Sequence, residues 1–197
     1  RMAGSLPVKS PRPLAHMRAV AEDLVRELSP YCERAEIAGS IRREKPECSD
    51  IELVCVPKFG AVTAPGALFP RQRNLLDDYI LRQPVRFGYR LDKNGRTANG
   101  ERYKRLAFFG CASGDVPLDL FSVLPPAQWG VVFLIRTGSA EFSRRSVTQW
   151  RYGGTLPDDL RVQDGGLWRG REALQVPEES TFFELCGCRY VPPEERQ

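Results

Sequence analysis

The stretch at residues 50–56, with the sequence DIELVCV, limits the possible folds of this chain more than any other feature. Side chains of a β-strand point alternately to opposite faces of its sheet. The alternation predicts one apolar face, formed by Ile51, Leu53 and Cys55. The other face carries the carboxylates of Asp50 and Glu52 beside Val54 and Val56, so we expect it to be only partly exposed to water.

The size and composition of the chain indicate a folded protein outside the membrane. The 197 residues are 42% hydrophobic and 27% charged, which is enough for a core in one domain or two small lobes and argues against disorder. No apolar run approaches the roughly 20 residues that span a bilayer, and the N-terminus lacks the apolar segment of a signal peptide. We therefore expect a cytoplasmic protein with no membrane partner.

The charged residues are unevenly distributed along the chain. Residues 71–105 contain ten basic and four acidic side chains, whereas residues 158–197 contain five basic and nine acidic ones. A basic middle beside an acidic tail is expected where a polyanion binds at one place, although a solvated basic face gives the same pattern.

The six cysteines, at positions 32, 48, 55, 111, 186 and 188, are expected to be reduced and mostly buried thiols. Cys186 and Cys188 are only one residue apart, which is too tight for the usual zinc-knuckle spacing, and His16 is the one histidine. A structural zinc site is therefore not expected.

Apolar spacing and turn residues predict an α+β fold. Helices are expected at residues 14–29, 71–82, 125–135 and 140–152, the last capped by Ser139, and a final helix from Pro177. Strands are expected at residues 35–41, 50–56, 85–91, 102–109 and 115–121, and shorter ones near 160–162, 167–169 and 173–176. A Gly/Pro loop is expected at 59–70 and a turn at Asn94-Gly95, and Pro117 favours an edge or bulge for its strand.

The candidate chemistry starts from the carboxylates of Asp50 and Glu52. Two acids two residues apart on one strand face repel one another unless cations lie between them, and hard oxygen ligands of this kind suit Mg²⁺ or Mn²⁺. A third acid, Asp119, lies on a later strand. Its side chain is expected on the sheet face opposite to that of Leu118 and Leu120. If those leucines pack into the core, Asp119 faces a cleft.

A candidate phosphate-binding segment precedes these acids by about ten residues. The backbone at Gly39 can approach an anion closely, the Ser40 hydroxyl is a donor, and Arg42 and Arg43 supply fixed positive charge. A phosphate site followed by a metal-binding carboxylate pair suits nucleotidyl transfer.

The order of these motifs resembles the nucleotidyltransferase superfamily typified by DNA polymerase beta, and within it the X-family DNA polymerases. Residues 129–142, WGVVFLIRTGSAEF, resemble the family's junction between palm and thumb, and residues 156–196 resemble its thumb. The resemblance covers residues 8–196 and is similar to compact phage or bacterial members. It implies a nucleotidyltransferase palm with a mixed β-sheet at residues 1–125 and a small α/β thumb-like lobe at residues 126–197.

The resemblance also implies roles for individual residues. Two Mg²⁺ or Mn²⁺ ions would be held by three carboxylates, those of Asp50, Glu52 and Asp119. The triphosphate would be bound by Gly39, Ser40 and Arg43, with Ser49 and Lys9 as further contacts. The sugar and base of the incoming nucleotide would border Thr137, Gly138 and Ser139.

The chain departs from the family pattern at several positions. Glu52 stands where aspartate is usual, and Pro117 where an arginine often touches the primer terminus. Ile135 and Arg136 replace an aromatic pair that often limits the sugar 2′ position, so we predict relaxed sugar selection. Residues that commonly meet the nascent base pair and template are replaced by Ala140, Ser143 and Val147. With only about 13 residues before the first helix, a lyase activity is not expected.

Basic and aromatic residues supply candidate DNA contacts. By the resemblance, Tyr103, Lys104 and Arg105 are expected near the primer strand. Arg144, Arg145 and Arg151 are expected near the template, although solvated basic surfaces remain an alternative for both groups. The three tryptophans, Trp129, Trp150 and Trp168, are interpreted as packing residues rather than as platforms for stacking bases.

Three functions remain open from the sequence. The first is addition of dNMP from dNTP to a DNA 3′-hydroxyl, in repair of short gaps or at primer ends, with protein partners supplying missing modules. The second is a template-independent nucleotidyltransferase acting on RNA, protein or a small molecule. The third is a non-catalytic module that binds DNA ends or gaps.

Overall fold

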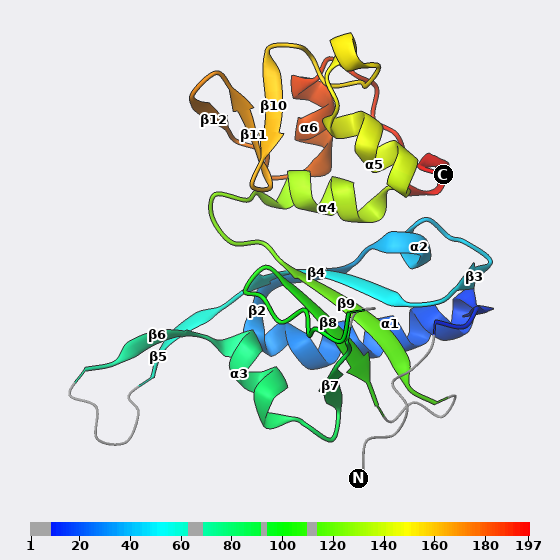
Figure 1. Cartoon of the computed structure of the whole chain (residues 1–197), viewed down its shortest axis with the longest axis vertical. Coiled ribbons are helices and arrows are strands. Elements are labelled where there is room, and N and C mark those ends of the chain that lie inside the picture. The colour runs from blue at the N-terminus through cyan, green and yellow to red at the C-terminus, as the bar shows by residue number, and fades with distance from the viewer. Residues whose placement is uncertain (1–8, 63–68, 92–93, 110–113) are drawn as a thin grey trace.

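A computed structural model describes residues 9–62, 69–91, 94–109 and 114–197 (Figure 1). The fold is α+β, as predicted, and its sheet is mixed. The division at residue 125 remains a prediction. Lys93, Cys111 and the first eight residues lie outside the described residues, as do residues 63–68 of the loop expected at 59–70. The loop prediction is wrong for Phe59–Val62, which form a β-strand.

Five strands form the main sheet, in the order β2-β4-β9-β8-β7. Their bounds are Cys32–Ile37 for β2, Ile51–Pro57 for β4, Phe87–Tyr89 for β7, Tyr103–Phe108 for β8 and Val116–Ser122 for β9. Strands β4 and β9 run parallel, and the other neighbours are antiparallel. The parallel pair brings together the two predicted acidic strands, which are far apart in the sequence.

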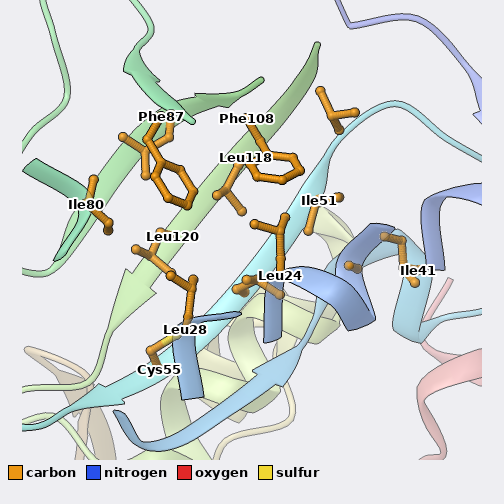
Figure 2. Close-up of a cluster of buried hydrophobic side chains, with 14 of the residues drawn as sticks. Leu24, Leu28, Ile41, Ile51, Cys55, Ile80, Phe87, Phe108, Leu118 and Leu120 are labelled. Atoms are coloured by element: carbon orange, nitrogen blue, oxygen red, sulfur yellow. The ribbon is translucent and has the colours of Figure 1, made fainter. Parts of the chain in front are cut away.

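Helix α1, Leu14–Leu28, covers one face of this sheet. Its apolar residues recur every three or four positions, so Met17, Ala21, Leu24 and Leu28 share one buried face. Figure 2 shows Leu24 and Leu28 packed toward Leu118 and Leu120 of the sheet. Pro30, in the short helix Ser29–Tyr31, follows the last turn and lacks the N–H that would continue the α-helix.

The opposite face of the sheet carries a smaller apolar cluster. Val54 and Phe121 from the sheet pack there against Trp129 and Phe133 of helix α4, Trp129–Thr137. In Figure 1, α4 lies between the sheet and the C-terminal lobe. This face also holds the two acidic side chains within β4 and β9, so α4 borders the candidate site.

The C-terminal lobe has its own buried cluster, which includes Val131, Leu156, Leu167 and Phe182. Its elements are α5 (Ala140–Val147), a 3₁₀ turn at Trp150–Tyr152, β10 (Leu160–Gln163), β11 (Gly166–Arg169), β12 (Glu172–Leu174), α6 (Glu179–Leu185) and a 3₁₀ turn at Pro193–Glu195. The short strands form an antiparallel sheet.

The remaining elements are short. They are β1 (Arg12–Pro13), which pairs with β3 (Glu47–Cys48), helix α2 (Gly39–Arg42), and the hairpin of β5 (Phe59–Val62) and β6 (Arg71–Asn74), followed by α3 (Leu75–Arg82). The hairpin projects from the end of β4 (Figure 1).

Two segments that were each predicted as one element contain both a strand and a helix. The strand expected at residues 35–41 ends at Ile37, because Gly39 turns with a φ of 61° and α2 begins. The helix expected at residues 71–82 starts only at Leu75. Residues before it pair with β5, and the side chain of Asn74 caps the helix by accepting from the N–H of Asp77 at 3.1 Å.

Three helices differ from their predicted bounds. The one expected at residues 125–135 runs over Trp129–Thr137, and Gln128 immediately before it is extended. The one expected at 140–152 ends at Val147, where Thr148 becomes extended. The last helix starts at Glu179, after the extended residue Glu178, rather than at Pro177.

The expectation that Pro117 marks an edge or bulge is wrong, since β9 is the central strand of the sheet. Pro117 pairs with Ala107 on β8, but pairing with β4 begins only at Leu118. The missing N–H of Pro117 therefore falls before the β4 ladder starts.

The cysteines of the described ranges agree with the predicted thiols. Cys32, Cys48, Cys55 and Cys186 are buried and Cys188 is half-buried, and none of these five forms a disulfide. Among the described residues, none of the helices has the length and apolar character to cross a bilayer.

Candidate functional site

The register of β4 and β9 sets the geometry of the acidic residues. Glu52 lies directly opposite Asp119 on the neighbouring parallel strand. Asp50 comes immediately before β4, two residues ahead of Glu52. Strand alternation turns Ile51 and Leu118 to the α1 side, so Glu52 and Asp119 are left on the face toward α4.

Asp50 is neutralised by a lysine from the N-terminal segment. The ammonium group of Lys9 forms an ion pair with the Oδ2 of Asp50. Burial lowers the pKa of Lys9, but its hydrogen bond to Asp50 and the charges of Asp50 and Asp119 outweigh burial and raise it. Lys9, predicted as a triphosphate contact, is thus placed beside a candidate metal ligand.

Glu52 occupies space that only a glycine at position 39 leaves open. A Cβ on Gly39 would lie 1.8 Å from the Oε2 of Glu52. Burial is the main reason that the pKa of Glu52 is raised to about 7, and the charges of Asp50 and Asp119 raise it further. The absence of a side chain at Gly39 therefore makes room for the neighbouring carboxylate.

Asp119 is 7% exposed and is surrounded by donors. The hydroxyl of Tyr103 donates to its Oδ1 at 3.0 Å, and nitrogens of Arg90 and Arg105 lie 3.9 Å from the same oxygen. Tyr103 in turn stacks on Phe121, with ring centroids 4.9 Å apart. The basic residues next to and within β7 and β8 thereby compensate the charge of this carboxylate.

A cleft of about 400 Å³ lies against these residues. It is lined by Ser40, Arg43, Asp50, Glu52, Ile135, Arg136, Gly138, Ser139, Ala140 and Ser143. The cleft thus brings together most of the predicted metal, triphosphate and sugar positions. Gly39, Ser49, Thr137 and Asp119 are not among its lining residues, and the Thr137 side chain is fully buried.

The wall of the cleft is tied to the C-terminal lobe by a chain of ion pairs. Arg42 binds both oxygens of Glu179, at 2.8 and 2.7 Å, and also donates to the Thr137 hydroxyl at 2.6 Å. Arg196, which is fully buried, binds Glu179 from the other side at 2.6 Å. The carbonyl of Arg196 accepts from the N–H of Ser139 at 3.0 Å.

Arg43 is also attached to this wall. Its Nη1 donates to the carbonyl of Thr137 at 2.6 Å, while its buried Nε has no partner within the described residues. The predicted triphosphate contact is therefore held against the turn at Gly138, with one nitrogen unpaired. Burial lowers the pKa of Arg43, and the charge of Glu52 opposes that shift.

Lys104 does not have the position expected of a DNA contact. It is 3% exposed, and its ammonium donates to Asp77 at 3.0 Å and to the carbonyl of Gly100 at 2.9 Å. Strand alternation explains the difference, because Lys104 points to the opposite face of β8 from Tyr103 and Arg105.

The other candidate DNA contacts are more exposed. Arg105 is half-buried beside Tyr103, and Arg144 pairs with Glu141 on the surface of α5. Arg145 is exposed, and its side chain makes no hydrogen bond or ion pair within the described ranges. These arginines remain candidates for binding a polyanion.

The packing interpretation of the tryptophans is wrong for Trp150, which is 56% exposed. Trp129 is buried, at 6% exposure, and its ring lies 4.9 Å from that of Phe133. Trp168 is half-buried on β11. Only Trp129 of these three therefore has the expected core position.

Several residues of this region were not singled out by the sequence patterns. Arg90 lies in the basic stretch at residues 71–105, but only the register of β7 and β8 brings it to Asp119. Glu179 and Arg196 lie more than 130 residues from Arg42 in the chain, and no local signal marks their pairing. Arg136, which was singled out from the sequence, lines the cleft, and its guanidinium lies 4.0 Å from the ring centroid of Phe121.

The three carboxylates are suitable ligands for a divalent cation, but they are not arranged around a common point in this structure. The described ranges contain no set of three or more His, Cys, Asp or Glu side chains arranged to hold a metal ion. Asp50 is bound by Lys9 and Asp119 by Tyr103. All three acids nevertheless offer hard oxygen donors on neighbouring strand positions, which suits Mg²⁺ or Mn²⁺. A cation bound there would compete with the Lys9 ammonium.

Comparisons with known proteins do not assign the chain to a family. None of the protein-family models matches the chain, and no curated protein sequence is significantly similar to it.

The raised pKa of Glu52 predicts a pH-dependent stability of the metal-free protein. A carboxyl whose pKa rises on folding stabilises the fold while protonated, and this stabilisation is lost as pH rises through the folded pKa. Between pH 4.5 and about 7 the free energy of unfolding should fall, by up to about 3 kcal/mol for a shift of this size. Urea denaturation in EDTA should show the fall in wild type and its loss in Glu52→Gln.

The matched control is Glu22→Gln, which removes an exposed carboxylate from α1. This control should keep the pH profile of wild type. An identical profile for Glu52→Gln and wild type would contradict the assignment of a buried, charge-crowded carboxyl at this position.

Proposed function

We propose that this chain is a metal-dependent nucleotidyltransferase that adds a nucleoside monophosphate from a nucleoside triphosphate to a DNA 3′-hydroxyl. The observation that carries the proposal is the pairing of Glu52 with Asp119 on adjacent parallel strands, beside a cleft that also presents Ser40 and Arg43. The order of the sequence motifs, which resembles the X-family DNA polymerases, supports the same reaction.

The residues of the cleft have complementary roles in this proposal. Asp50 and Glu52, which line the cleft, and Asp119, which lies opposite Glu52, would hold the divalent cations. Two such ions would favour ionisation of the attacking hydroxyl and neutralise the departing pyrophosphate. The Ser40 hydroxyl and the Arg43 guanidinium donate to the triphosphate oxygens, and the turn at Gly138 borders the sugar.

The reaction exchanges the phosphoanhydride bond between the α- and β-phosphates for a phosphate ester bond. The 3′-oxygen forms a bond to the α-phosphorus, the bond from that phosphorus to the bridging oxygen breaks, and pyrophosphate leaves. The proton of the 3′-hydroxyl passes to solvent. We expect Arg43 to stabilise the negative charge that develops on the leaving group, and its hydrogen bond to the Thr137 carbonyl supports this role by fixing the guanidinium.

A template-independent transferase is the second candidate. Ala140 and Ser143, which line the cleft from α5, are small side chains that offer little contact to a nascent base pair. An acceptor other than a paired primer terminus would fit such a wall.

Primer extension separates these candidates. We expect the protein, with Mg²⁺ or Mn²⁺, to lengthen the primer of a short-gap duplex by one or a few nucleotides chosen by the template base, and EDTA to abolish this. Ribonucleotides should also be incorporated, because Ile135 and Arg136 line the cleft in place of an aromatic pair.

Each contrary result has a separate meaning. Incorporation indifferent to the template base would favour the template-independent enzyme. Tight DNA binding without turnover in either metal would contradict catalysis and leave a DNA-end or gap-binding module. Strict rejection of ribonucleotides would contradict relaxed sugar selection alone.

A further inference from the structure

The turn that follows α5 displays two aromatic rings to solvent. Trp150 is 56% exposed and Tyr152 is 70% exposed, and both belong to one 3₁₀ turn. Two large aromatic side chains exposed on one short turn make this turn a candidate surface for binding a partner.

The turn holds the ring of Trp150 in a fixed place. The indole N–H of Trp150 donates to the carbonyl of Thr155 at 2.9 Å, and its backbone N–H donates to the carbonyl of Leu156 at 2.8 Å. Leu156 is 1% exposed and belongs to the core of the lobe. A Cβ on Gly154 would lie 1.8 Å from the Thr148 carbonyl, so the turn is tightly closed. Little conformational entropy is therefore lost when a partner covers the Trp150 ring.

The charge around the turn favours an anionic partner. Residues 142–157 contain three arginines and no acid. The Arg145 side chain is exposed and has no partner within the described residues, and the Arg151 guanidinium lies 5.1 Å from the ring centroid of Tyr152. The nearest following acid, Asp158, accepts from the backbone N–H of Arg151 at 3.0 Å.

The position of the turn connects it to the candidate site. Helix α5 begins at the cleft, where Ala140 and Ser143 form part of the lining, and ends at Val147, just before the turn. The eight residues of this helix span about 12 Å at 1.5 Å per residue. A nucleic-acid strand leaving the cleft along α5 would reach the rings within a few nucleotides.

We propose that Trp150 and Tyr152 stack with bases of single-stranded DNA, such as the unpaired template beyond the cleft, while Arg145 and Arg151 bind its phosphates. The choice of DNA as the partner rests on the proposed function. Stacking is tolerant of sequence because every base has a π-face, so a repair enzyme could hold any template strand in this way.

The inference is tested by oligothymidylate binding in EDTA without nucleotide, so that catalysis plays no part. Fluorescence anisotropy of a labelled oligonucleotide should show affinity at least about fivefold weaker for Trp150→Ala and for Tyr152→Ala. The control Phe59→Ala removes an aromatic side chain of similar exposure, 54%, from β5 and should bind like wild type. Circular dichroism checks that each variant is folded.

A second variant keeps the test valid if Trp150→Ala disturbs the turn. Trp150→Phe retains a ring for stacking but removes the exposed indole, so it should bind within about twofold of wild type and lose the tryptophan quenching that oligonucleotide causes. Unchanged affinity in both alanine variants, or quenching that persists in Trp150→Phe, would overturn the inference. Self-association that Trp150→Ala abolishes, with DNA affinity unaltered, would instead make the turn a protein contact and also overturn it.

The two proposals fail separately. Binding that depends on Trp150 without any nucleotide incorporation would leave the stacking surface and remove the enzyme. Template-directed incorporation with binding independent of Trp150 and Tyr152 would leave the enzyme and remove the stacking surface.

Discussion

Replacing Asp119 by asparagine should reduce nucleotide incorporation by about a thousandfold or more, since metal ions supply several kcal/mol of charge stabilisation and each 1.36 kcal/mol is a tenfold rate change. The Asp119→Asn variant should still fold, because the amide oxygen can accept the hydrogen bond that the Tyr103 hydroxyl donates to Asp119 at 3.0 Å. Single-turnover primer extension with Mg²⁺ measures the effect.

The matched control for this change is Asp164→Asn. Asp164 is an exposed residue in the turn between β10 and β11, with a φ of 53°, a backbone conformation that asparagine tolerates. Incorporation by this control should equal that of wild type. Full activity in Asp119→Asn would contradict the proposed function, whatever the activity of the control.

Replacing Glu179 by alanine should lower the free energy of unfolding by about 3–5 kcal/mol, the cost of leaving a buried charge without its partner. Glu179 is 5% exposed and is bound by two arginines, one of them the fully buried Arg196. Its loss leaves the Arg196 guanidinium with the Val191 carbonyl as its remaining hydrogen-bond partner in the described ranges. Urea denaturation followed by circular dichroism measures the change.

The pH dependence of this ion-pair cluster has the opposite sign to that of Glu52. Burial alone would raise the pKa of Glu179, but hydrogen bonds from Arg42 and Arg196 outweigh it and lower the pKa below its ordinary value of 4.5. A lowered pKa contributes stability above the unfolded value that is lost as pH falls. The advantage of wild type over Glu179→Gln should therefore shrink below pH 4.5.

Glu141→Ala is the control for the Glu179 change. It breaks an ion pair of the same two residue types, but Glu141 and Arg144 are both 62% exposed on α5. Exposed pairs contribute about 0–1 kcal/mol, so the control should change the unfolding free energy by no more than that. Equal losses in the two variants would contradict a special role for the buried cluster.

Local periodicity predicted the elements whose burial follows a simple repeat. The alternation in β4 and β9 and the three- and four-residue spacing in α1 are confirmed, because one face of each meets a continuous core. The errors fall where a single residue redirects the chain. Gly39 ends β2 with a positive φ, and Asn74 caps a helix that was expected to begin earlier.

The sequence predicted most residues of the candidate site but not the residues with which they form ion pairs. The acids, Ser40 and Arg43 were selected from the sequence, and the sheet brings them to one region. The partners of these residues come from distant segments: Lys9 on Asp50, Arg90 near Asp119, and Glu179 on Arg42. Such pairings depend on tertiary packing, for which a sequence repeat carries no signal.

Exposure of Trp150 was mispredicted for a different reason. Tryptophan is buried on average, so composition favoured a core position. The hydrogen bond from its indole to Thr155 satisfies the polar group within the turn and leaves the ring outside. A side chain whose polar atom is bonded locally does not need the protein interior to satisfy it.

The contact of Gly39 with Glu52 couples the evolutionary histories of two positions. A methyl group at residue 39 would collide with the carboxylate, and its φ of 61° already disfavours any side chain there. Descendants of this sequence that retain glutamate at position 52 should therefore also retain glycine at position 39. A shorter side chain at position 52 would remove the collision but not the backbone strain, so glycine stays favoured at position 39 in either case.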